Sequence, residues 1–110
     1  NHGIYAVQAS IINGNEANAS NAGNHGIYAN QSSTIEAWGA DASGAGGHGV
    51  YANQASIINA ISVNARKGAV DSAEDIYVAS GSIIKISSTQ TIGGTNQATN
   101  TLTRNGIIFE

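Results

Sequence analysis

The chain lacks several residue types, and each absence narrows what the protein can be. None of its 110 residues is cysteine, which excludes a disulfide-framed fold and a thiolate metal site. Proline and methionine are also absent. Because no Met is present and Asn1 opens in the middle of a repeated phrase, we expect the chain to be the C-terminal fragment of a longer protein.

Charge is scarce as well. Charged residues make up 10% of the chain and the net charge is −3, against a usual charged share of roughly 25%. Nucleic-acid binding needs a clustered basic face, so we expect no nucleic-acid partner. No apolar run approaches the roughly 18 residues of a membrane helix, and no segment resembles a signal peptide, so we expect no membrane insertion.

What the chain does contain is a repeated phrase at a fixed interval. NHGIYA occupies positions 1–6 and 24–29, and GHGVYA occupies positions 47–52, each 23 residues after the previous copy. A fourth copy begins at Asp75, and its Tyr77 lies 26 residues after Tyr51. Three residues are therefore inserted, and we place them in 66–75, the most charged stretch. The step of 23 also relates His2, His25 and His48; Gln8, Gln31 and Gln54; Ser10, Ser33 and Ser56; and Ile12, Ile35 and Ile58.

The composition of the repeat indicates strands and turns rather than helices. Short runs of β-branched residues are separated by Gly and Asn, and the leucine spacing of leucine-rich repeats is missing. We therefore predict an all-β fold, a right-handed parallel β-helix of about four coils over residues 1–86, with about 23 residues and three short strands in each coil.

Alternation of apolar residues predicts three inward-facing sides. Each inward pair is separated by one residue, as a strand requires. The many alanines predict a narrow prism, in which each side chain lies over its equivalent about 4.8 Å away. The Gln and Ser columns are then expected to form hydrogen-bonded ladders. In the first coil the inward pairs are Ile4 and Ala6, Ile12 and Gly14, and Ala17 and Ala19.

Two columns of larger side chains are predicted to point outward. Together they would form an apolar patch of the kind that marks an interface. A slim solenoid buries little by itself, so we expect a parallel homotrimer, although a dimer would use the same patches. The predicted interface ladder consists of Tyr5, Tyr28, Tyr51, Tyr77, Ile11, Ile57 and Ile83, with Thr34 in the second column.

The 23-residue register is lost after Ile86. Residues 87–110 are rich in Thr and Gly and end in a predicted strand, Gly106–Phe109. Solenoids need atypical ends that stop edge-to-edge growth, so we expect a C-terminal β cap here. A trimer-locking segment or a receptor-contacting tip is the alternative.

The repeats and the C-terminal tail together resemble a known family. Coils built on GIYA…SIINA, closed by GGTN at 93–96 and NGIIF at 105–109, are similar to the C-terminal parts of bacteriophage tail spikes, tail fibres and appendages with a pectate-lyase-like β-helix. The resemblance implies a homotrimer, a place in the phage tail outside the cell, and attachment to a host surface. Some members cleave polysaccharide and many only bind.

The chemistry-bearing residues do not predict an enzyme in this part of the chain. Glycosidases need two carboxylates roughly 5–9.5 Å apart. Only Glu36 and Asp41, across a turn, and the acids Asp71, Glu74 and Asp75, in a loop that we expect to be solvated, come close in sequence. No nucleophile elbow and no phosphate-binding loop is present, and no cofactor is expected.

Histidine and aromatic residues leave two alternatives each. A metal site needs a third or fourth ligand, and no acid accompanies each of His2, His25 and His48, so we expect a turn ladder rather than a metal site. The tyrosines are expected at the subunit interface, with a glycan-stacking platform as the alternative. Trp38, which stands where the neighbouring coils have Asn15 and Ile61, is a candidate for glycan contact or for interface packing.

These observations predict a structural and host-attachment segment of a phage tail spike or appendage. Its expected partners are further copies of itself and a host cell-surface polysaccharide. A bacterial surface adhesin with the same solenoid, and the distal end of a polysaccharide-degrading spike, remain as alternatives.

Overall fold

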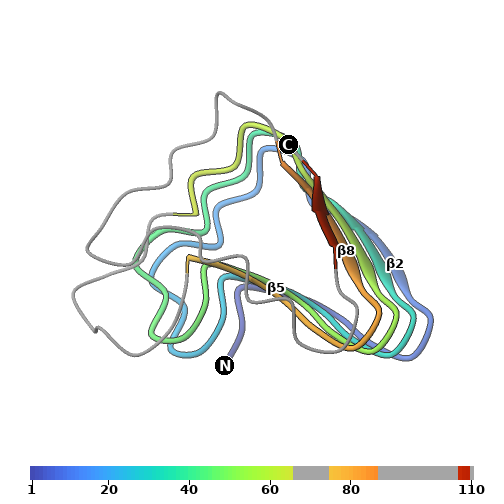
Figure 1. The fold of residues 1–110 in the computed structure, drawn as a ribbon. Coiled ribbons are helices and arrows are strands. Elements are labelled where there is room, and N and C mark those ends of the chain that lie inside the picture. Colours follow the sequence, from blue (N-terminus) through green and yellow to red (C-terminus); the bar gives the residue numbers. More distant parts are fainter. Residues whose placement is uncertain (66–74, 87–106, 110) are drawn as a thin grey trace.

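The computed structural model describes residues 1–65, 75–86 and 107–109, and these residues form a parallel β-helix of about three turns. Successive coils lie behind one another along two straight sides of a triangular outline (Figure 1). None of the described residues belongs to a helix long and apolar enough to span a membrane. The strands are β1 (Ile4–Ala6), β2 (Ile11–Asn13), β3 (Ile27–Ala29), β4 (Thr34–Glu36), β5 (Val50–Ala52), β6 (Ile57–Ala60), β7 (Ile76–Val78), β8 (Ile83–Ile86) and β9 (Ile107–Phe109).

Two parallel sheets carry the repeat, and their register confirms the 23-residue period. The first sheet has the order β1-β3-β5-β7 and the second has the order β2-β4-β6-β8-β9. Tyr5 pairs with Tyr28, which pairs with Tyr51, and Tyr51 pairs with Tyr77 across the longer step. We expected about four coils; β7 and β8 begin a further turn on the three described ones.

The position of the three-residue insertion follows from two registers. Asp41 still bridges to Asn64 at the 23-residue step, whereas Val50 pairs with Ile76 at the longer one. The extra residues therefore lie between Asn64 and Ile76, as predicted, and residues 66–74 of that segment lie outside the described residues. The predicted cap also lies outside them, except for its final strand β9, which pairs with β8 in parallel.

The third side of each coil contains single-residue bridges, so the prediction of a third strand there is wrong. Asp41 bridges to Asn18 and to Asn64, and its neighbours do not extend the ladder. Residues with positive φ interrupt the extended backbone on this side, among them Glu16, at 58°, and Ser62, at 57°. A residue in the left-handed region cannot continue a strand, so the ladder is reduced to bridges, although backbone bonds between coils continue on either side, as from the N–H of Glu16 to the carbonyl of Trp38.

The corner between the two sheets is built from two consecutive residues in the left-handed region. Gln31 and Ser32 have φ of 56° and 60°, and the equivalent residues of the other coils match them. The backbone N–H of Ser32 donates to the carbonyl of Gln54 at 2.8 Å, one coil away. The Gln column therefore lies at this corner with exposed side chains, and its contacts between coils are made by the backbone.

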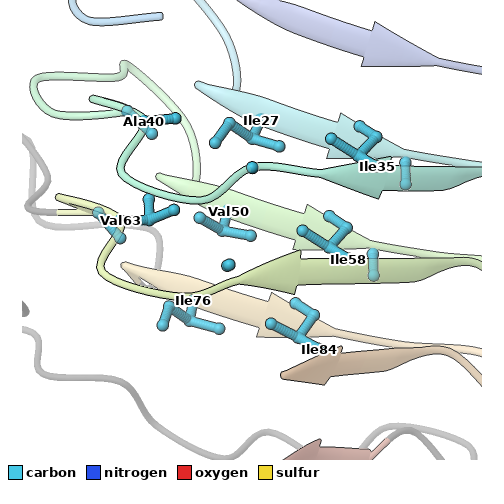
Figure 2. Packing of buried hydrophobic residues seen from close by; sticks show 14 of the residues in the cluster. Ile27, Ile35, Ala40, Val50, Ile58, Val63, Ile76 and Ile84 are labelled. Atoms are coloured by element: carbon cyan, nitrogen blue, oxygen red, sulfur yellow. The ribbon is translucent and has the colours of Figure 1, made fainter. Parts of the chain in front are cut away.

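The interior is a stack of matched apolar side chains, as the alternation predicted. Ile27, Val50 and Ile76 lie in one column and Ile35, Ile58 and Ile84 in another (Figure 2), and all six are fully buried. One inward position of each sheet enlarges at the last step, from Ala52 to Val78 in the first sheet and from Ala60 to Ile86 in the second. Burying each of the isoleucines is worth roughly 1.5–3 kcal/mol, so this core supplies most of the driving force for folding.

The serine column confirms the predicted ladder, although its bonds run from the backbone to side chains. The N–H of Ser10 donates to Ser33 Oγ at 3.2 Å, and the N–H of Ser33 donates to Ser56 Oγ at 3.2 Å. Ser56 continues the series to Ser82 Oγ at 3.0 Å. Because these hydroxyls are buried, each one satisfies a backbone donor that would otherwise cost free energy at the start of a strand.

Glycine closes the corner between the third side and the first sheet. A Cβ added at Gly26 would lie 2.7 Å from Ala42 Cβ and 2.7 Å from the carbonyl oxygen of Gly49. We expect Gly26→Ala to lower the free energy of unfolding by about 1–3 kcal/mol, measured by urea denaturation, because the rigid backbone there must move.

Gly14→Ala is the matched control for that substitution. Its Cβ would meet mainly the flexible end of Ile4 at 2.9 Å, and the equivalent positions of the next two coils are Ala37 and Ala60. We expect a change within about 1 kcal/mol. Equal destabilisation by the two variants would contradict this account of the corner.

Candidate functional site

The predicted tyrosine column exists on the outer face of the first sheet, and its rings stack on one another. The ring centroids of Tyr5 and Tyr28 are 5.0 Å apart and those of Tyr28 and Tyr51 are 4.7 Å apart, with interplanar angles of 10° in both pairs. Parallel strands in register place identical side chains one coil apart, which is close to the stacking distance of aromatic rings. The column therefore stabilises the coil stack from outside.

This stacking decides what the tyrosines can offer to a partner. The two faces of the Tyr28 ring are covered by Tyr5 and Tyr51, so a sugar ring cannot stack on Tyr28. The same column presents ring edges and hydroxyl groups outward, and Tyr28 and Tyr51 are only half-exposed. The interface role of the column stays a prediction, whereas the geometry argues against the glycan-stacking platform.

The histidine column lies directly beside the tyrosines. His2 and His25 stack with centroids 5.1 Å apart, and so do His25 and His48. The N–H of His48 donates to Nδ1 of His25 at 3.0 Å, and the N–H of His25 donates to Nδ1 of His2 at 3.4 Å. Nδ1 must be unprotonated to accept this bond, so a neutral imidazole with its proton on Nε2 fits the site.

The two columns contact each other, and Tyr77 ends both. The His25 ring lies 5.1 Å from Tyr28 and 5.0 Å from Tyr51, with edge contacts. Tyr77 pairs with Tyr51 in the sheet, yet its ring stacks on His48, with centroids 4.5 Å apart and 6° between the planes. The fourth coil has Glu74 in place of a histidine, so the Tyr77 ring covers the last imidazole.

Burial and neighbouring imidazoles lower the pKa of the histidines. The pKa of His25 falls from 6.5 to about 4, because of burial first, then of the charges that His48, His2 and the α-amino group would present. The pKa of His2 is lowered by burial and by the α-amino group. Burial also raises the pKa of Tyr28 and Tyr51 above 10.0, so both phenols stay neutral at physiological pH.

The second outward column lies on the second sheet and is more exposed. Ile11 exposes 82% of its surface and Ile57 exposes 45%, whereas Thr34 and Ile83 are half-buried. All four occupy one register position of β2, β4, β6 and β8, and Ile107 of β9 is the backbone partner of Ile83. Ile11 and Ile57, separated by Thr34, are the exposed apolar members of this column.

Trp38 lies two residues after the end of β4, in a turn, and exposes 51% of its surface. Its backbone N–H donates to Asn15 Oδ1 at 2.7 Å, and its carbonyl accepts from the N–H of Glu16 at 2.7 Å. The backbone at this position is therefore fixed by the preceding coil, while the indole remains open to solvent.

The candidate acidic pair is used for structural hydrogen bonds. Glu36 Oε2 accepts from Asn59 Nδ2 at 2.8 Å, and Asp41 Oδ1 accepts from the N–H of Ser43 at 2.9 Å in a turn. Asp75, expected in a solvated loop, is fully buried, so that prediction is wrong; it stands where the preceding coils have the corner glycine. Asp71 and Glu74 lie outside the described residues.

Metal ligation is not indicated where the structure describes the chain. No group of three or more His, Asp or Glu side chains in those segments could hold a metal ion. Stacked, nearly parallel imidazoles also direct their nitrogen lone pairs alongside one another rather than toward one point. Comparison with known proteins adds no relative: no family model, no curated protein and no solved structure matches the chain.

Sequence reasoning missed three features of this surface. Nothing in the residue types signalled the left-handed pairs at the corner, because Gln, Ser and Ala occupy positions that usually favour Gly. The contact between the histidine and tyrosine columns depends on how the corner turns. In the fourth coil the Tyr77 ring stacks on His48, and this could have been anticipated because position 74 holds glutamate where the earlier coils have histidine.

The histidine column predicts loss of stability in mild acid. In the unfolded chain His25 takes up a proton near pH 6.5, whereas in the folded chain it does so only near pH 4. The contribution of neutral His25 to the free energy of unfolding is therefore full above pH 6.5 and is lost as the pH falls toward 4. We expect a loss of about 1–2 kcal/mol in urea unfolding across this window, since solvent screens a half-exposed ring.

His25→Asn tests the cause, because an Asn oxygen can still accept the N–H of His48 but does not titrate. The variant should show a flatter stability profile between pH 6.5 and 4. His2→Asn, whose ring has a histidine on one side only, should change the profile less. An unaltered profile in His25→Asn would show that the column is not responsible.

Proposed function

We propose that this chain is a structural and host-surface attachment segment of a bacteriophage tail spike or appendage. The observation that carries the proposal is the outward column of Ile11, Thr34, Ile57 and Ile83, in which Ile11 and Ile57 are exposed, on a regular parallel β-helix. A solenoid of this kind is stiff along its axis and presents the same chemistry at every coil. These properties suit a rod that holds a binding surface away from a particle.

Self-association is the second part of the proposal. Exposed apolar residues at the coil spacing need a covering surface with the same repeat, and another copy of this chain provides one. We propose a homotrimer, which the resemblance to tail spikes implies, with residues 87–110 serving as the C-terminal cap. Right-handed coiling is also proposed, since parallel strand crossovers are right-handed in about 98% of cases.

The exposed isoleucines provide the test of self-association. We expect the chain to have three times its 11.1 kDa mass in solution, measured by light scattering. The double variant Ile11→Thr and Ile57→Thr should shift the mass toward one chain at micromolar concentration, because it removes the two most exposed isoleucines. Thr34 already occupies this column, so the fold tolerates threonine there. A wild-type chain that stays monomeric would contradict the trimer.

Surface attachment is tested separately with cells. The fluorescently labelled 110-residue chain should bind saturably to a subset of bacterial strains from a mixed panel of Gram-positive and Gram-negative species. Binding should disappear from cells whose surface polysaccharide has been removed enzymatically or chemically. Absence of binding to every strain, or equal binding to treated and untreated cells, would contradict attachment through a surface glycan.

A further inference from the structure

Trp38 follows Glu36 by two residues, in the turn that comes after β4, and both side chains are exposed. Thr34, Glu36 and Trp38 alternate with the buried residues Ile35 and Ala37, so they point to the same side. The Cα atoms of residues two apart are at most roughly 7 Å from each other, which is close to the width of one pyranose ring. A sugar that contacts the indole can therefore also reach the carboxylate.

Trp38 differs from the four tyrosines in the availability of its ring. Within the part of the chain that the structure describes, the indole stacks on no other ring, whereas the Tyr28 ring is covered on both faces. Asn15 holds the Trp38 backbone and leaves the side chain exposed. Among the described aromatic residues, Trp38 thus combines an exposed side chain with an unstacked ring.

Polar side chains occupy positions next to Trp38 along its own coil and in the adjacent coils. Glu36 is exposed, and its Oε2 is oriented by Asn59 Nδ2 at 2.8 Å. Asn59 Oδ1 has no hydrogen-bond partner among the described residues, which is costly for a buried acceptor. Asn13 and Asn15 occupy the equivalent positions in the preceding coil. An aromatic surface with a few convergent carboxylate and amide groups is a common composition for a small-ligand site.

We propose that Trp38, Glu36 and Asn59 form a subsite for a neutral glycan. The indole packs against the apolar face of a pyranose ring, the Glu36 carboxylate accepts hydrogen bonds from adjacent hydroxyls, and the Asn59 amide orients that carboxylate. The negative charge of Glu36 disfavours an acidic sugar, and Lys85 lies two coils away in the same column. This subsite rests on the proposed attachment function and specifies the ligand class.

The single tryptophan makes the subsite directly observable. Neutral trisaccharides of glucose, galactose, mannose and N-acetylglucosamine serve as probes, with trigalacturonate as the acidic counterpart. We expect a saturable change in Trp38 emission with at least one neutral trisaccharide and none with trigalacturonate. By titration calorimetry, Trp38→Ala should weaken that binding at least tenfold, and Glu36→Gln should weaken it several-fold.

Tyr28→Phe is the control variant, because it removes a hydroxyl from the tyrosine column and keeps the stacked ring. It should bind the trisaccharide as the wild type does. Circular dichroism checks that Trp38→Ala remains folded, as expected for an exposed side chain whose backbone bond to Asn15 is retained.

Three results would overturn the subsite. These are no emission change with any neutral trisaccharide, a preference for trigalacturonate, or unaltered affinity in Trp38→Ala. The outcome is separable from the attachment function: if the labelled chain binds cells and its Trp38→Ala variant binds them equally well, attachment stands and the subsite is wrong. If neither the wild-type chain nor the Trp38→Ala variant binds cells, the attachment function itself is wrong.

Discussion

The backbone hydrogen bonds between coils impose the constraint on which the rest of this structure depends. The first three coils pair in parallel at a constant register of 23 residues, so that each strand residue lies beside its equivalent one coil away. A side chain must therefore fit its own copy about 4.8 Å away as well as its neighbours in the coil. Isoleucine on isoleucine, serine on a backbone donor, and tyrosine on tyrosine all satisfy this condition without a large core.

The same constraint controls the outer surface. Aromatic rings at the coil spacing stack on one another, so the tyrosine column contributes to stability and loses its ring faces as binding surfaces. In the second outward column Thr34 lies between Ile11 and Ile57, and both isoleucines remain exposed. The repeat is also broken at single positions of this surface. Trp38, between Asn15 and Ile61, is such a break.

The histidine column makes the stability of the coil stack depend on pH. Within a stack of imidazoles, a proton on one ring breaks its bond from the next coil and places charge beside another ring. Protonation therefore destabilises the corner that joins the histidine column to the first sheet. Tyr77, which covers His48 at the end of the column, extends the stack with a ring that stays neutral.

The amino-acid sequence by itself determined the period, the inward residues and the two outward columns. Identical residues 23 positions apart, such as Tyr5 and Tyr28, leave only one register in which like pairs with like. It also located the insertion before Ile76, since the repeat resumes there at a longer step.

Tertiary structure alone decided the remaining features. Left-handed residues at Glu16 and Ser62 reduce the third side to bridges, and Asp75 is buried where a solvated loop was expected. The tyrosine faces are closed because the coil spacing matches the stacking distance of aromatic rings, a coincidence of two lengths that no single residue encodes. Backbone turns and ring orientations depend on contacts between coils, and those contacts exist only after the chain has wound.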